Sequence, residues 1–113
     1  SNGVITNYTV NGIRRVDLTI SVGYETDLQL AKDIILNVLD SIPEILKEPE
    51  TAVFINNLAS SSIDFAVRPF TENENYWKVK SDVLEKIKLA FDKVGIEIPY
   101  PHQVEISKEQ KTI

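Results

Sequence analysis

The sequence predicts an α+β fold with the element order β-α-β-β-α-β between residues 14 and 98. Apolar residues alternate with polar ones in short runs, a pattern typical of half-buried strands. In two longer runs apolar residues recur every three or four positions, which is typical of amphipathic helices. This order is the split βαβ pattern of ferredoxin-like folds, so we expect a four-stranded antiparallel sheet with both helices on one face.

The first strand of this unit is predicted over residues 14–24. Its alternation places one set of apolar side chains on a single face: Val16, Leu18, Ile20 and Val22. Ahead of it, residues 4–10 have the composition of a strand, and Asn11-Gly12 is a tight-turn signal. We therefore expect a strand or hairpin to precede the ferredoxin-like unit.

The first helix is predicted to begin at a capping box formed by Thr26 and Gln29 and to end before Pro43. Its apolar stripe consists of Leu28, Ala31, Ile35, Val38 and Ile42. The second helix is predicted from about residue 76 to residue 94, with Gly95 as its C-terminal cap. Its expected inward-facing residues are Val83, Leu84, Ile87, Ala90, Phe91 and Val94.

Three further strands complete the prediction. Residues 52–58 and 63–70 are rich in β-formers and are separated by the loop-like run from Ser60 to Ser62. Residues 96–98 follow the second helix and are predicted to form the last strand of the sheet.

Composition excludes several classes of function. The chain has 113 residues, consistent with one domain, and 17 acidic against 12 basic residues give a net charge of −5, which opposes nucleic-acid binding. An RNA-recognition motif shares the element order but needs exposed aromatics on its central strands, whereas Phe65 is predicted to face the core. The longest apolar run, from Ala52 to Ile55, is too short to cross a membrane.

No catalytic, cofactor-binding or metal-binding residues are predicted. His102 is the single histidine and cysteine is absent, so a zinc centre or a histidine-based triad lacks partners. Methionine is also absent, so we expect the chain to be part of a longer protein or of a processed one.

The end of the chain is the more informative part. Pro99 and Pro101 flank Tyr100 and favour an extended arm. Beyond them Val104 and Ile106 alternate as in a short strand, but no later segment remains to pair with it. Either this segment is a disordered tail, or copies of the strand from several subunits pair side by side and close a barrel without free edges. The candidate interface residues are Pro99, Tyr100, Pro101, Val104, Ile106 and the aromatic Trp77.

The succession of several segments resembles the cytoplasmic part of the small-conductance mechanosensitive channel (MscS) family. These segments are SNGVITNYTV, DLTISVGYETDL, INNLASSSIDFAVRPF, YWKVKSDVLEKIKLAFDKVGI and GIEIPYP. The resemblance implies a homoheptameric channel of the inner membrane that opens under tension and releases ions and small solutes on hypo-osmotic shock.

On this resemblance, residues 1–13 would be the last strand of a middle β domain, residues 14–98 an α/β domain, and residues 99–113 the arm, barrel strand and tail. This portion would lie on the cytoplasmic side, serve assembly and filtering, and reach the membrane only through helices absent from the chain. The alternative is a ferredoxin-like regulatory domain that binds a small ligand, which predicts a polar-lined pocket at a helix or subunit interface.

Overall fold

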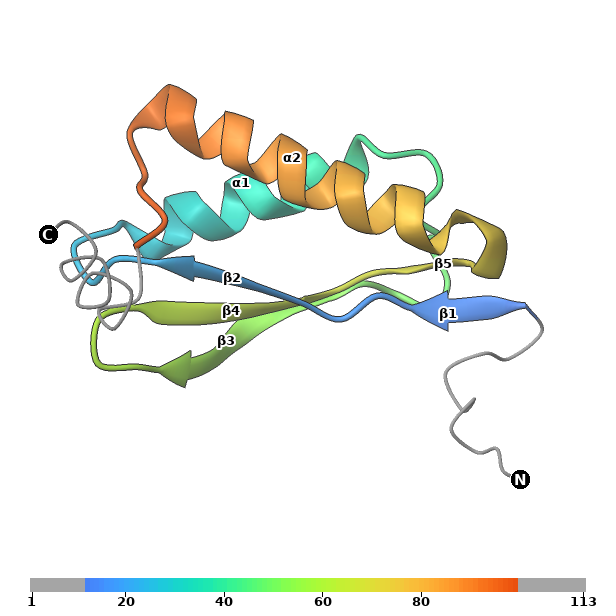
Figure 1. Ribbon diagram of the computed structural model, residues 1–113, viewed down its shortest axis with the longest axis horizontal. Coiled ribbons are helices and arrows are strands. Elements are labelled where there is room, and N and C mark those ends of the chain that lie inside the picture. The colour runs from blue at the N-terminus through green and yellow to red at the C-terminus, as the bar shows by residue number, and fades with distance from the viewer. Residues whose placement is uncertain (1–11, 100–113) are drawn as a thin grey trace, which may run out of the picture.

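The computed structural model describes residues 12–99 as two helices packed on one face of a β-layer (Figure 1). The elements in order are β1 (Ile13–Arg15), β2 (Leu18–Val22), α1 (Leu28–Asp40), β3 (Ala52–Leu58), β4 (Ile63–Arg68), β5 (Phe70–Glu72), the short 3-10 helix η2 (Asn73–Asn75) and α2 (Tyr76–Val94). The prediction that both helices share one face is confirmed.

The strands form two antiparallel sheets, one of β2-β4-β3 and one of β1-β5. The predicted strands over residues 14–24 and 63–70 are therefore each divided in two. Pro69 lies at the break between β4 and β5 and has no N–H to donate to a ladder. Its carbonyl still accepts a hydrogen bond of 2.8 Å from the Val16 N–H, so the pairing continues across the break.

The predicted final strand is wrong: residues 96–98 lie in no strand, and the larger sheet has three strands instead of four. Gly95 ends α2 in the left-handed conformation with φ of 79°, as expected of a C-terminal cap. The next N–H, that of Ile96, donates back to the Phe91 carbonyl at 3.0 Å. This donor closes the helix and is therefore not available for strand pairing, and Pro99, which follows the segment, has no N–H to donate.

The cap of α1 also differs from the prediction. Asp27, and not Thr26, is the N-cap, because its carboxylate accepts hydrogen bonds from the N–H groups of Gln29 and Leu30. The helix ends at Asp40 and is capped by Ser41, before Pro43 as predicted.

The core lies between the helices and the three-stranded sheet. The predicted alternation of the first strand is confirmed, because Val16, Leu18, Ile20 and Val22 are all buried. On α2, however, Leu84 and Val94 are 41% and 49% exposed, and the predicted stripe is shifted. The buried residues of α2 are Val79, Val83, Ile87 and Phe91.

Candidate functional site

The predicted interface residues are not brought together by the described part of the fold. Trp77 stands in the first turn of α2, whereas Pro99 follows its other end. A helix of 19 residues is roughly 28 Å long, so these two positions lie at opposite ends of the domain. The other predicted residues, Tyr100, Pro101, Val104 and Ile106, lie outside the described residues, as do His102 and the strand predicted over residues 4–10.

Trp77 is the most exposed large apolar side chain of the described residues, at 69%. Its ring meets Tyr76 edge to face, with 4.9 Å between the ring centroids, and the Lys80 Nζ lies 5.2 Å from its centroid. The guanidinium of Arg14, a residue of β1, lies 3.7 Å from the centroid of the Tyr76 ring. Two aromatic rings and two cations therefore cluster where α2 begins, with Trp77 exposed and the other three half-buried. Aromatic residues and arginine are enriched in protein interfaces.

A second exposed apolar surface lies on β3, which was not predicted as part of any site. Phe54, Ile55 and Leu58 are 40%, 44% and 66% exposed. The register pairs Ile55 with Phe65 and Leu58 with Ile63, so both project to the face that carries the helices, whereas Phe54, paired with Ala66, projects to the opposite face. The apolar residues of the run AVFINNL were visible in the sequence, but the sequence does not show that β3 is an outer strand.

A hydrogen-bonded cluster lies on the opposite face of the sheet, around Asp64 in β4. The hydroxyls of Ser21 and Ser62 donate to Asp64 Oδ1 at 2.7 and 2.9 Å. The hydrogen bond from Ser21 is the largest cause and lowers the pKa of Asp64 below its ordinary value. Burial, the second cause, acts in the opposite direction, and Ser62 and Asn57 add smaller lowering contributions. This carboxylate is therefore held in its charged form.

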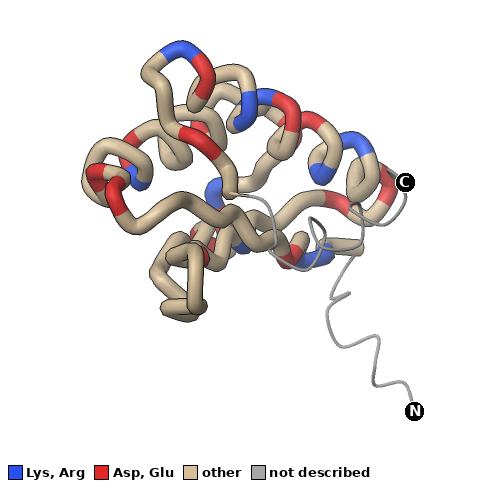
Figure 2. Tube along the Cα trace, turned by 60° about the vertical axis from the view of Figure 1, so that its left-hand side comes forward, with Lys and Arg blue, Asp and Glu red and all other residues tan. Residues whose placement is uncertain are grey.

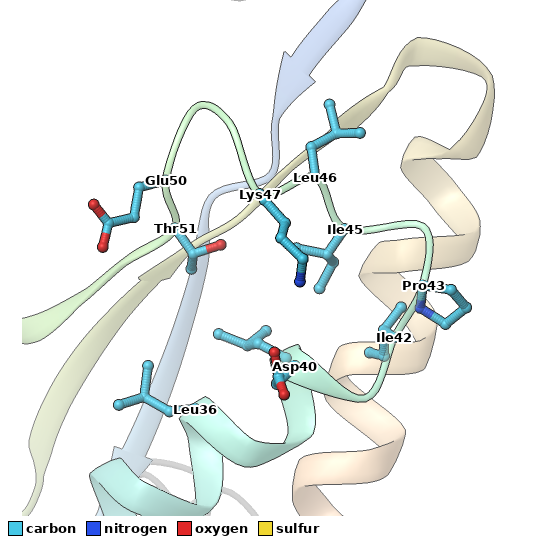
Figure 3. Close-up of a pocket in the computed structure, with 10 residues that line it drawn as sticks. Leu36, Asp40, Ile42, Pro43, Ile45, Leu46, Lys47, Glu50 and Thr51 are labelled. Atoms are coloured by element: carbon cyan, nitrogen blue, oxygen red, sulfur yellow. The ribbon is translucent and has the colours of Figure 1, made fainter.

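A groove of about 660 Å³ lies between the end of α1 and the segment that follows it, residues 42–51 (Figure 3). Its apolar lining includes Leu39 and Ile42, which are 4% and 3% exposed, and the more exposed Leu36. Asp40, Lys47 and Thr51 add polar groups. A pocket with polar groups beside a helix is the feature that the ligand-binding alternative predicts.

Lys78 connects this segment to α2. Its Nζ lies 2.9 Å from Asp82 Oδ2 and 3.3 Å from Glu44 Oε2. These two carboxylates, Asp82 first, raise the pKa of Lys78 above its ordinary value. The ammonium thus joins the beginning of α2 to the segment after α1.

Charge and metal-ligand geometry within residues 12–99 give no sign of other sites. Acidic and basic residues are interspersed along the trace and form no single basic face (Figure 2). In the same part of the chain no three His, Cys, Asp or Glu side chains are grouped as a metal site would require. Among these residues, too, no helix has the length and apolar character needed to cross a membrane.

Comparison with known proteins decides the family. Residues 16–98 match the family described as "Mechanosensitive ion channel MscS, C-terminal". The chain belongs to the MscS family. Curated MscS relatives include a protein of Archaeoglobus fulgidus, 38% identical over 100 residues that make up 88% of this chain and 35% of the relative. The small-conductance mechanosensitive channel of Edwardsiella ictaluri is 32% identical over 99 residues, covering 88% of this chain and 35% of that protein.

Solved structures agree with this assignment. The closed-state crystal structure of Helicobacter pylori MscS is similar with a TM-score of 0.74 and 34% identity, over 80% of this chain and 36% of that one. Arabidopsis thaliana MSL1 has a TM-score of 0.65 at 15% identity, over 80% of this chain and 35% of its own, which shows the fold alone. The chain therefore spans about a third of the length of its MscS relatives. Its mixed α/β domain of two helices and two sheets is that of the MscS C-terminal region.

Proposed function

We propose that this chain is part of a channel subunit that opens under bilayer tension and releases ions and small solutes during hypo-osmotic shock. The match of residues 16–98 to the C-terminal region of MscS supports this proposal most directly. Similarity to proteins named as small-conductance mechanosensitive channels, at 32% and 34% identity, also supports it. The family is one of channels and not of enzymes, consistent with a non-catalytic role.

Within the channel, this part serves assembly and filtering on the cytoplasmic side of the inner membrane. The subunits form a homoheptamer, in which the segment from Val104 to Ile106 contributes one strand of a shared barrel. The two exposed apolar surfaces, at Trp77 and along β3, support a role in subunit contacts because they lie on different elements. A cyclic assembly requires two different surfaces on each subunit that meet between neighbours.

The functional test uses the full-length gene in a bacterial strain that lacks its own mechanosensitive channels. We expect expression to restore survival after a shift from high to low osmolarity and to give tension-activated currents in membrane patches. The empty vector is the control. Absence of both rescue and current, in cells where the protein is detected in the membrane, would refute the proposal.

The oligomeric state has a separate test. We expect the mass of the full-length protein purified in detergent to correspond to seven subunits by light scattering. Another stable stoichiometry would refute the heptamer without affecting the channel function. A ligand-binding role remains a second candidate because of the groove next to α1, and it is compatible with a place in a channel.

A further inference from the structure

The groove next to α1 has walls that are fixed before any ligand arrives. The main chain of residues 44–46 is bound to β5: the Leu46 N–H donates to the Phe70 carbonyl at 2.8 Å, and Ile45 forms a β-bridge with Thr71. The buried Thr71 hydroxyl also donates to the Glu44 carbonyl at 2.8 Å. These bonds hold the segment away from α1, so its apolar side chains line an open space instead of collapsing onto the helix.

The volume and lining of the groove suit a small molecule with an apolar part. Its volume of about 660 Å³ is within the range of small-ligand sites, roughly 300–1,000 Å³. Leu39 and Ile42 line it from the end of α1 and the residues after it, and Ile45 and Leu46 from the segment opposite. A branched aliphatic or aromatic side chain would bury its surface among these residues.

The charges at the groove select the kind of molecule. Lys47 and Thr51 point into the groove, and Glu50 also lines it, with its carboxylate directed to one side (Figure 3). Asp40 lies on the other wall, at the end of α1. Within residues 12–99, neither Lys47 nor Asp40 belongs to an ion pair. A cation and an anion thus stand at the groove with both charges available.

We propose that this groove binds a free α-amino acid with an apolar side chain, such as leucine. Its carboxylate pairs with Lys47, its ammonium with Asp40, and its side chain enters the apolar lining. A zwitterion pairs with both protein charges, whereas a fatty acid or an alkyl amine pairs with one and leaves the other exposed side chain to water. The site goes beyond the proposed channel function and does not depend on it.

The test titrates the 113-residue chain with L-leucine and follows backbone amide NMR signals. We expect saturable shifts confined to residues that line the groove. Isovalerate keeps the carboxylate but lacks the ammonium, and isopentylamine keeps the ammonium but lacks the carboxylate. Each should therefore bind at least about tenfold more weakly than leucine. L-glutamate should not compete. Equal binding of isovalerate or isopentylamine would overturn the choice of a zwitterion.

Matched variants locate the site. Leu36→Asp should abolish leucine binding, whereas Leu89→Asp, at a leucine on α2 that is similarly exposed, should leave it unchanged. Lys47→Ala should weaken binding about tenfold, with Lys93→Ala in the last turn of α2 as its control. Each variant is first compared with the parent by its NMR spectrum to confirm that it is folded.

Three outcomes would overturn the proposal. The first is no saturable shift up to the solubility of leucine. The second is equal loss of binding in the Leu89→Asp control, which would place the ligand elsewhere. The third is a groove whose signals, without ligand, change with protein concentration, because a second copy of the chain would then occupy it.

Discussion

The two outer strands of the three-stranded sheet occupy equivalent positions but have very different surroundings. Both β2 and β3 pair with the central strand β4, and both direct apolar side chains toward the helices. In β2 those residues are buried: Leu18, Ile20 and Val22 are 7%, 4% and 0% exposed. In β3, Ile55 and Leu58 are 44% and 66% exposed. The helices thus cover the β2 side of the sheet more completely than the β3 side.

This difference separates residues that hold the fold from residues that are available for contacts. A further opening of about 270 Å³ lies between the first turn of α1 and β3, lined in part by Leu28, Ile55 and Phe65. No described element covers the outer edge of β3, so its unpaired backbone groups and exposed apolar side chains are accessible to another chain. We therefore expect mutations in β2 to affect stability, and mutations in β3 to affect the association of full-length subunits.

The largest expected effect compares one isoleucine in each strand. Ile20→Ala should lower the free energy of unfolding by about 3 kcal/mol, because it leaves a cavity in a closed core. Ile55→Ala should cost less than about 1 kcal/mol, because nearly half of this side chain is already in water. Urea unfolding of both variants measures the difference. Equal losses would show that β3 is as well covered as β2.

A smaller effect is expected at the cap of α1, whose first turn forms the opening next to β3. Asp27→Ala removes the acceptor of the Gln29 and Leu30 N–H groups and should cost about 1 kcal/mol. Asp27→Asn, which keeps a capping oxygen, is the control, and its loss of stability should be at most a few tenths of that of Asp27→Ala. Thermal unfolding by circular dichroism measures both. If Thr26→Ala were the more damaging change, the sequence-based cap would be correct after all.

A pH-dependent effect is expected on the other face of the sheet. Ser21→Ala removes the main cause that lowers the pKa of Asp64, so this pKa should rise toward its ordinary value of 3.8. The hydrogen bond favours the charged carboxylate and hence stabilises the folded state above pH 3.8, and this contribution is lost as pH falls through the lowered pKa.

The variant should therefore be less stable than the parent at neutral pH, by about 1 kcal/mol or less, and the difference should disappear in acid. Carboxyl NMR titration measures the pKa, and unfolding at several pH values measures the stability. Thr19→Ala on the neighbouring exposed position of β2 is the control. A difference that persists below the pKa of Asp64 would contradict this assignment.

The smallest expected effect is on association of the 113-residue chain alone. The barrel strand predicted around Val104 to Ile106 has about four residues and contributes few hydrogen bonds, each of about 1 kcal/mol. These do not offset an association cost of several kcal/mol per subunit. We expect a mainly monomeric species in sedimentation at micromolar concentration, and no change on Leu58→Asp. A stable heptamer that Leu58→Asp disrupts would show that the β3 surface suffices for assembly.

The sequence alone determined the elements that depend on local pattern. The bounds of α2 and the buried alternation of the first strand follow from the spacing of apolar residues along the chain. The end of α2 follows from Gly95, which adopts the left-handed conformation readily. Both are properties of residues that are neighbours in the sequence. The order of homologous segments also pointed to the family, which the match over residues 16–98 confirmed.

Only the tertiary structure decided which surfaces are open. Whether β3 is an outer strand, whether residues 96–98 join the sheet, and whether residues 42–51 leave a groove next to α1 all depend on contacts between segments distant in the chain. Ile55 and Ile20 both point to the face that carries the helices, and the packing of the helices buries Ile20 but leaves Ile55 44% exposed. Local pattern fixes the face to which a side chain points, whereas burial depends on what the rest of the chain places over that face.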